Sequence, residues 1–250
     1  MNEFILKCVD VTKSYGGLVA LDRVSFEVSA HEVFGVIGPN GAGKTTLFDV
    51  ISGVSTADTG SMNFRGREIG RLAAADIAQS GLLRTFQTPV TFPDLTVREN
   101  ILVGAYFGGN RESADNPAFR SEKINQVLDF CGLGNVSSQI AGQMPILARK
   151  QLMIATALVA DPKLLMLDEP IGGLNRQEQG LIIGLLKDLN AAGITLLIIE
   201  HVMSALLAIA NRLLILDYGK VIFDGIAADA INDENVLQAY LGTEAEAFRT

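Results

Sequence analysis

A glycine-rich loop between positions 38 and 46 holds the residues with the clearest chemical meaning in this sequence. Their spacing fits the pattern G-x-x-x-x-G-K-[ST], in which glycines let backbone N–H groups turn inward around phosphates. The apolar run 33–37 before the loop predicts a buried strand, and 47–51 after it predicts a helix. This order is what the motif requires, and it favours a phosphate loop over a plain glycine-rich turn before a helix. The loop therefore predicts binding of a nucleoside triphosphate.

The parts of this loop have different expected tasks. Lys44 is expected to reach the β- and γ-phosphates, and Thr45 to bind Mg²⁺. The start of the following helix adds the positive end of its dipole. The expected nucleotide-binding residues of the loop are Gly38, Pro39, Asn40, Gly41, Ala42, Gly43, Lys44, Thr45 and Thr46.

A second segment ends in two adjacent acids. The apolar run 164–167 predicts a strand that delivers Asp168 at its carboxyl end, where Asp168 can hold Mg²⁺ through water. Glu169 follows directly and can polarise the attacking water. By themselves, two acids after a strand are explained equally well as a helix cap. Together with the phosphate loop they predict a hydrolytic site.

The order of the motifs resembles that of the ATP-binding-cassette (ABC) ATPases over almost the whole chain. Tyr15 matches the aromatic residue that stacks on adenine, and Gln87 matches the glutamine that contacts Mg²⁺ and water and joins the two lobes. His201 matches the histidine that contacts the γ-phosphate, and 173–175 matches the loop that crosses to a partner cassette. Each has an ordinary alternative as a turn or structural residue, but six elements in this order argue against coincidence. The resemblance implies catalytic roles for Glu169, His201 and Gln87, and metal binding by Thr45, Gln87 and Asp168.

Three stretches narrow the resemblance. The segments 16–22, 84–87 and 238–242 resemble the LivG-type subunit of branched-chain amino-acid importers, and importers of urea and related amides share them. The resemblance implies ATP and Mg²⁺ as cofactors and a second cassette as partner, either a different, LivF-like chain or a second copy. It also implies a membrane permease, a solute-binding protein that acts indirectly, and a position on the cytoplasmic face of the membrane.

One segment departs from the ABC pattern. The family begins the helix before the acid-bearing strand with Leu-Ser-Gly-Gly-Gln, and residues 144–148 occupy this place. Pro145 has neither the serine hydroxyl nor a backbone N–H. Leu147 stands where the LivG-type subgroup keeps a glycine, and its side chain should obstruct a phosphate. Arg149 and Lys150 are expected on a solvated helix face, with a compensating charge near the phosphate as the alternative.

This departure has an asymmetric consequence in the family's architecture. Two cassettes dimerise head to tail, and each ATP lies between the phosphate loop of one chain and the signature of the other. The altered signature therefore weakens the site whose lysine belongs to the partner, while this chain's Lys44, Asp168, Glu169 and His201 are intact.

The composition excludes some classes of function. The 250-residue chain carries a net charge of −8, which argues against general nucleic-acid binding. Apolar residues make up 48% of it, but no apolar run reaches the about 18 residues of a membrane span. No N-terminal stretch has the pattern of a signal peptide. Cys8 and Cys131 lack metal-type spacing, so a reducing compartment is expected.

Alternating strands and helices predict the fold class α/β. The expected core is that of a P-loop NTPase, with a mostly parallel sheet flanked by helices and with antiparallel strands near the N-terminus. Within one ABC ATPase domain over 1–250, the nucleotide-binding core would comprise 1–88 and 161–225. A helical subdomain would be inserted at 89–160, and 226–250 would form a helical tail.

Local patterns predict individual elements of this fold. They are strands at 5–11, 24–28, 195–199 and 213–216, a hairpin turn at 217–220, helices at 121–130, 149–159 and 178–190, and an exposed loop at 108–113. On the last of these helices, Leu181, Ile182, Leu185 and Leu186 are expected to share the buried face.

Two other functions are weighed against a transporter motor. Soluble ABC proteins of translation or DNA repair usually carry two cassettes or a long coiled coil, whereas this chain has one cassette and no heptad run. A small-molecule kinase or GTPase could use the same loop, but the chain lacks a guanine-reading Asn-Lys-x-Asp. That alternative also leaves Gln87 and the pair Glu169 and His201 unexplained.

Overall fold

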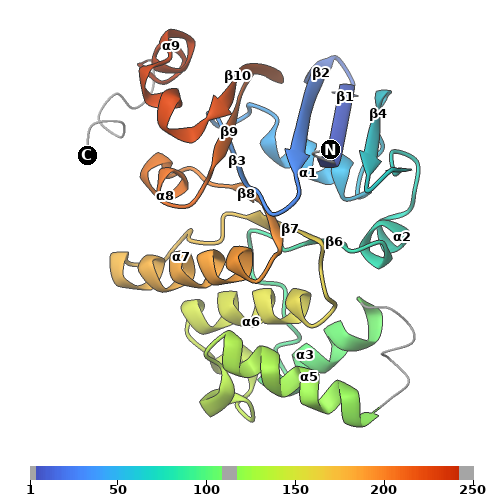
Figure 1. Ribbon diagram of the computed structural model, residues 1–250, viewed down its shortest axis with the longest axis vertical. Coiled ribbons are helices and arrows are strands. Elements are labelled where there is room, and N and C mark those ends of the chain that lie inside the picture. The colour runs from blue at the N-terminus through green and yellow to red at the C-terminus, as the bar shows by residue number, and fades with distance from the viewer. Residues whose placement is uncertain (1–3, 109–116, 242–250) are drawn as a thin grey trace.

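The computed structural model describes residues 4–108 and 117–241, which form two sheets and the helices around them (Figure 1). The loop expected at 108–113 lies, apart from Gly108, outside the described residues. The same holds for 242–250 of the expected tail.

The larger sheet has six strands drawn from the whole chain. Five of them are parallel neighbours, and the sixth is the antiparallel hairpin partner of β9. The order across the sheet is β10 (Lys220–Ile226), β9 (Arg212–Asp217), β3 (Val33–Ile37), β8 (Thr195–Ile199), β7 (Leu164–Asp168) and β6 (Leu82–Arg84). Every residue of β3, β7 and β8 is buried, as in parallel sheets covered on both faces. The predicted parallel strands and the hairpin turn at 217–220 are confirmed.

The smaller sheet is antiparallel, as expected for the N-terminal part of the chain. Its order is β2 (Leu18–Ser29), β1 (Phe4–Tyr15), β4 (Thr59–Phe64) and β5 (Arg67–Glu68). The first two strands are longer than the predicted 5–11 and 24–28, because the tight turn between them lets pairing continue to Tyr15 and Leu18.

Helix α1 (Lys44–Ile51) joins the two sheets. Its Leu47 and Phe48 belong to the same buried cluster as Leu21 of β2 and Phe34 of β3. The phosphate loop that precedes α1 is thereby fixed between the sheets.

The segment 89–160 contains helices in its described part, and these lie together at one end of the molecule (Figure 1). They are α3 (Val97–Phe107), α5 (Pro117–Phe130), α6 (Ile146–Leu158) and the short 3₁₀ turns Gly134–Val136 and Ala141–Gln143. The helices predicted at 121–130 and 149–159 are confirmed with earlier starts. The division into a core and an inserted helical subdomain stays a proposal, which this arrangement supports.

Helix α7 (Arg176–Ala191) corrects one predicted contact. Its buried apolar residues are Ile182, Leu185, Leu186 and Leu189, whereas Leu181 is 59% exposed. Leu181 was wrongly expected on the buried face, because at about 100° per residue it lies roughly a quarter turn from the middle of the stripe. The helix packs along one stripe only.

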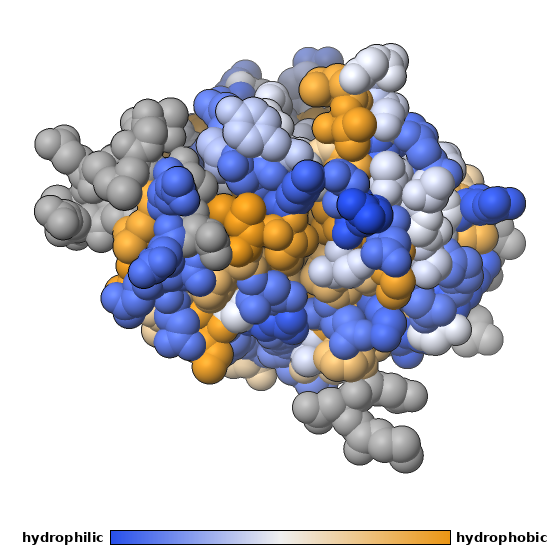
Figure 2. Space-filling model, turned by 90° about the horizontal axis from the view of Figure 1, so that it is seen from above, coloured by the Kyte–Doolittle hydropathy of each residue, from blue (hydrophilic) through white to orange (hydrophobic). Residues whose placement is uncertain are grey.

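The remaining elements are short. They are α2 (Ala74–Gln79), α8 (Met203–Leu207), the 3₁₀ helix Ala227–Asn232 and α9 (Glu234–Leu241). In the described part of the chain, no helix combines the length and apolar character needed to cross a membrane. Seen from above, the apolar side chains gather in separate patches among hydrophilic ones (Figure 2).

Candidate functional site

A cavity of ≈ 440 Å³ lies beside the phosphate loop. Most of the expected site residues line it, although they come from distant parts of the chain: Tyr15, Asn40, Gly41, Ala42, Gly43, Lys44, Thr45, Thr46, Gln87, Glu169 and His201. Sequence reasoning missed four other lining residues, which are Leu18, Val19, Ala20 and Tyr218. The last of these stands at the tip of the β9–β10 hairpin, and only the hairpin signal pointed to its position.

Neighbouring backbone sets the shape of the phosphate loop. Gly43 has φ 103, and a Cβ there would lie 2.4 Å from the carbonyl oxygen of Ala20. Gly41 has φ 82 but faces open space, because a Cβ at this position would meet no atom within 4 Å. Gly219 N–H donates to the Ala42 carbonyl at 3.0 Å. The hairpin and β2 therefore pack against the loop at Ala42 and Gly43, whereas the space at Gly41, which lines the cavity, is open.

Lys44 lies buried inside its own loop. Its Nζ donates to the carbonyl oxygens of Gly38 at 2.6 Å and Pro39 at 2.9 Å, so these two residues contribute as lysine acceptors rather than as cavity walls. Burial lowers the pKa of Lys44, and the charges of Glu169 and Asp168 oppose that shift. The loop thus holds the Lys44 amine close to its own backbone, at the place where phosphates would sit.

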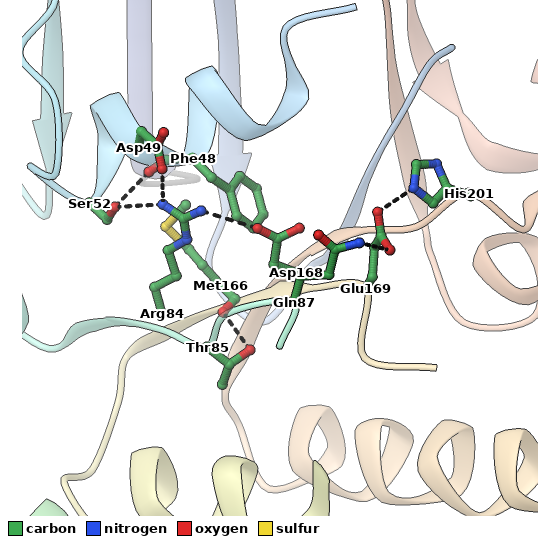
Figure 3. Close-up of polar contacts among 10 residues, drawn as sticks. All are labelled: Phe48, Asp49, Ser52, Arg84, Thr85, Gln87, Met166, Asp168, Glu169 and His201. Carbon is green, nitrogen blue, oxygen red and sulfur yellow. Dashed lines mark hydrogen bonds and ion pairs between the residues drawn. The ribbon is translucent and has the colours of Figure 1, made fainter. Parts of the chain in front are cut away.

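Glu169 brings two of the expected catalytic side chains together. It follows β7 with φ 50, and its N–H donates to the Ile199 carbonyl at 2.9 Å. Gln87 Nε2 donates to Glu169 Oε2 at 2.6 Å, and His201 Nε2 contacts Glu169 Oε1 (Figure 3). The carboxylate therefore bridges the residues that follow β6 and β8.

Asp168 lies behind the cavity rather than in its wall. Its side chain is 7% exposed, and Arg84 donates to its Oδ2 at 3.1 Å (Figure 3). Burial raises the pKa of Asp168, and the Arg84 hydrogen bond and charge oppose this. Arg84 belongs to the 84–87 stretch used for the family resemblance, but sequence reasoning gave it no task.

Lys150 contradicts the expectation of a solvated helix face. It is 2% exposed, and its Nζ donates to the carbonyl oxygen of Glu169 at 2.7 Å. The expectation failed because the first turns of α6 face the segment after β7, so Lys150 points inward and bonds the Glu169 carbonyl instead of extending into solvent. Arg149 beside it is partly buried, and its Nε lacks a partner among the described residues.

Glu200 is a buried acid that sequence reasoning passed over. It precedes His201, is 2% exposed and accepts a hydrogen bond from the Ile171 N–H at 2.8 Å. Burial raises the pKa of Glu200 to about 7, helped by the charge of Glu169 and opposed by that of Lys150. A single acid in the printed sequence carries no signal of such burial.

The segment 144–148 lies at the start of α6, where it was expected. Pro145 is the N-cap of this helix and no side chain caps it, while Met144 is 4% exposed and belongs to the apolar core. The expected crossing loop 173–175 ends in Asn175, whose side chain accepts from the N–H groups of Gln177 and Glu178 at the start of α7.

Comparison with known proteins decides the family. The family described as "ABC transporter" matches residues 21–172, more than half of the chain. The chain belongs to the ABC transporter family. It is an ATP-binding cassette of the kind that hydrolyses ATP for transport. The predicted family and fold are confirmed.

Two relatives of this ABC cassette resemble it along nearly its whole length. A probable branched-chain amino acid transport ATP-binding protein LivG of Methanocaldococcus jannaschii is 34% identical over 95% of this chain and 97% of its own. The high-affinity LivG protein of Escherichia coli K12 is 32% identical, over 97% and 99%.

Among solved structures, an ATP-binding cassette of an ABC transporter in its ADP conformation is 32% identical, with a TM-score of 0.88. The alignment covers 96% of this chain and 99% of that one. A nucleotide-free cassette is 31% identical with a TM-score of 0.86 over 95% and 99%.

Proposed function

We propose that this ABC cassette binds and hydrolyses ATP to power the import of branched-chain amino acids, or of a related small polar solute, through a separate permease. The names of the relatives support the cargo, at 32–34% identity over nearly the whole chain. Urea or short amides are the alternative cargo. The soluble ABC proteins are not favoured by these relatives.

One observation carries the proposal for the site. The phosphate loop, Tyr15, Gln87, Glu169 and His201 line one cavity, although Tyr15 and His201 stand near opposite ends of the sequence. The lining combines an aromatic ring, a lysine and a carboxylate, which suit a base, a phosphate chain and an attacking water.

ATP fits this cavity by the chemistry of its lining. The open space at Gly41, which lines the cavity, leaves room for phosphate oxygens, and Lys44 supplies the cation. Tyr15, which is 48% exposed, offers its ring to adenine. Oxygen atoms of Thr45, Gln87 and Asp168 are the donor type that Mg²⁺ prefers, and Mg²⁺ would neutralise phosphate charge there.

Glu169 is the proposed base that orients the attacking water. Its contacts to Gln87 and His201 hold the carboxylate at the edge of the cavity. A hydrogen bond from His201 can then move to developing charge on the terminal phosphate, because neutral imidazole keeps one N–H donor. Gln87 follows β6 and connects this step to the helices beyond it.

The permease would dock in an apolar groove on the helical side of β6. Phe86, Val90, Phe107 and Met153 line it, and the first three are 43%, 69% and 79% exposed. Phe86 and Val90 flank Gln87 along the chain, so a partner seated in the groove is mechanically close to the nucleotide. This docking would keep the cassette on the cytoplasmic face of the membrane as a peripheral subunit.

The second cassette is proposed to be a different, LivF-like chain, with a homodimer as the alternative. The start of α6 carries Pro145 and Leu147, which suit a phosphate poorly. A partner with an intact signature would complete the site formed by this chain's own loop.

The test of nucleotide binding is the variant Lys44→Ala. Removing the only cation placed in the loop should lower ATP affinity by about 10- to 100-fold, since a hydrogen bond to a charged group contributes about 1.5–3 kcal/mol. The matched control Lys187→Ala, an exposed lysine of α7, should bind ATP as the unmodified chain does. Titration with a fluorescent ATP analogue measures both, and equal affinities for the two variants would refute the site.

A further inference from the structure

Arg84 is the last residue of β6, at the edge of the larger sheet, and its side chain is only 5% exposed. Burying a guanidinium away from water costs folding free energy unless hydrogen-bond acceptors surround it. Its partners therefore indicate what the surrounding structure uses it for.

Those partners come from two elements of the nucleotide site. One terminal nitrogen of Arg84 donates to Asp49 Oδ1 at 2.6 Å and Ser52 Oγ at 3.2 Å, beside the end of α1. The other terminal nitrogen donates to Asp168 Oδ2 at 3.1 Å, at the end of β7 (Figure 3). The planar fork of a guanidinium fixes the two carboxylates relative to each other, which a lysine could not do.

Two aromatic rings complete the surroundings of the guanidinium. Its central carbon lies 5.5 Å from the ring centroid of Phe48 and 4.9 Å from that of Phe86, within the range of cation–π attraction. Phe48 belongs to α1, directly after the phosphate loop, and Phe86 lines the apolar groove. Arg84 is thus in contact with both the nucleotide side and the groove side of the molecule.

We infer that Arg84 is a positioning residue for the magnesium ligand. It holds the Asp168 carboxylate through Oδ2, which leaves the other oxygen for Mg²⁺, and it fixes this carboxylate to Phe86 in the groove wall. The inference rests on the proposed function, because it takes Asp168 as the metal-binding acid. The competing explanation is a structural bond that only ties β6 to α1 through Asp49.

The charges around Arg84 favour a role in positioning Asp168 over a purely structural role. Asp49 alone would satisfy the cation, yet a second, more deeply buried carboxylate is held on the opposite side of the fork. Without Arg84, Asp168 would face the like charge of Asp49 with no counter-charge bonded to it. The carboxylate would then lose the hydrogen bond that fixes its orientation, whereas the bonds of Lys44 within the phosphate loop do not involve Arg84.

The experiment is a Mg²⁺ titration of nucleotide binding by the purified full chain. A fluorescent ATP analogue is bound first in excess EDTA and then at rising Mg²⁺ concentration, for the unmodified chain, Arg84→Gln, Asp168→Asn and Asp49→Asn. Thermal unfolding and binding in EDTA check that each variant is folded. Arg84→Lys, which keeps the charge but not the fork, is the second variant in case Arg84→Gln does not fold.

We expect Arg84→Gln to bind the analogue in EDTA as the unmodified chain does. It should need about tenfold more Mg²⁺ to reach the same increase in affinity for the analogue. A tenfold shift is the loss expected for one oriented, charge-assisted hydrogen bond. Asp168→Asn should shift in the same direction, and Arg84→Lys by less than Arg84→Gln. Asp49→Asn should stay near the unmodified chain, because the bond from Arg84 to Asp168 remains.

Two results would overturn the inference while the proposed function stands. One is an unchanged Mg²⁺ dependence in Arg84→Gln, and the other is an equal shift in Asp49→Asn. Absence of nucleotide binding in the unmodified chain would instead refute the proposed function.

Discussion

Glu169 is the residue whose surroundings give the sharpest test of chemistry. Glu169→Gln keeps the shape of the side chain and an oxygen that can accept from Gln87, but it loses the charge that would orient water. We expect ATP affinity to stay and hydrolysis to slow by about 10²- to 10⁴-fold, the usual contribution of a general base. Phosphate release by the assembled transporter measures this, and undiminished turnover would exclude Glu169 as the base.

Glu200 gives a pH-dependent prediction. Its pKa is raised to about 7 from 4.5, so between pH 5 and pH 8 the folded chain binds more protons than the unfolded chain. The free energy of unfolding must therefore fall as pH rises through this window. Glu200→Gln cannot ionise and keeps an acceptor for the Ile171 N–H. It should gain thermal stability over the unmodified chain at pH 8 and lose that advantage toward pH 5.

Melting temperatures of the two proteins across this pH range measure the effect. Subtracting the melting temperature of one protein from that of the other at each pH removes the contribution of groups that titrate alike in both. This holds as long as the substitution leaves the charges of Lys150 and Glu169 unchanged. A difference that does not change with pH would contradict the burial of an ionisable Glu200.

At the scale of elements, two glycines of the phosphate loop distinguish the effect of backbone strain from that of a steric clash. Gly43 and Gly41 both have positive φ, but only at Gly43 would a Cβ meet backbone, at 2.4 Å from the Ala20 oxygen. Gly43→Ala should therefore cost about 1–3 kcal/mol more stability than Gly41→Ala, as overpacking does in well-packed places. Thermal or denaturant unfolding of the two variants gives the comparison, and equal losses would argue that the loop moves freely away from β2.

Elements with regular patterns could be predicted, and elements defined by their neighbours could not. The strand 195–199 was predicted to the residue because it is apolar throughout apart from its first residue. β6 has three residues and no pattern of its own, so its place beside β7 depends on pairing between distant segments. Helix α3 was missed although its capping box, Thr96 with Glu99, is visible in the sequence and could have revealed it.

In the candidate site too, residues that belong to a sequence pattern could be predicted, and contacts that depend on packing could not. Tyr15, Lys44, Gln87, Glu169 and His201 could be named because their spacing matches a family pattern. The contacts of Arg84 with Asp168, and of Lys150 with Glu169, could not be predicted, because the burial of a charged side chain is decided by what packs over it.

At the scale of the whole molecule, the altered segment 144–148 predicts unequal sites in a cassette dimer. The purified chain alone should hydrolyse little ATP, and activity should appear with a second cassette whose signature is intact. In that pair, disabling Glu169 should cost far more activity than disabling the equivalent acid of the partner. Phosphate release by the two mutant pairs decides it, and equal losses or vigorous hydrolysis by this chain alone would favour two equivalent sites.

The bond from Lys150 to the Glu169 carbonyl has a mechanical consequence for the molecule. It joins α6, among the helices, to the segment that follows β7 of the sheet. Because this ammonium is buried, water is not at hand to replace the carbonyl as acceptor. Any rotation of α6 must therefore either move the Glu169 peptide with it or leave the buried Lys150 ammonium without this hydrogen-bond acceptor. A displacement of α6 is transmitted to the Glu169 peptide through this hydrogen bond, without the involvement of a nucleotide.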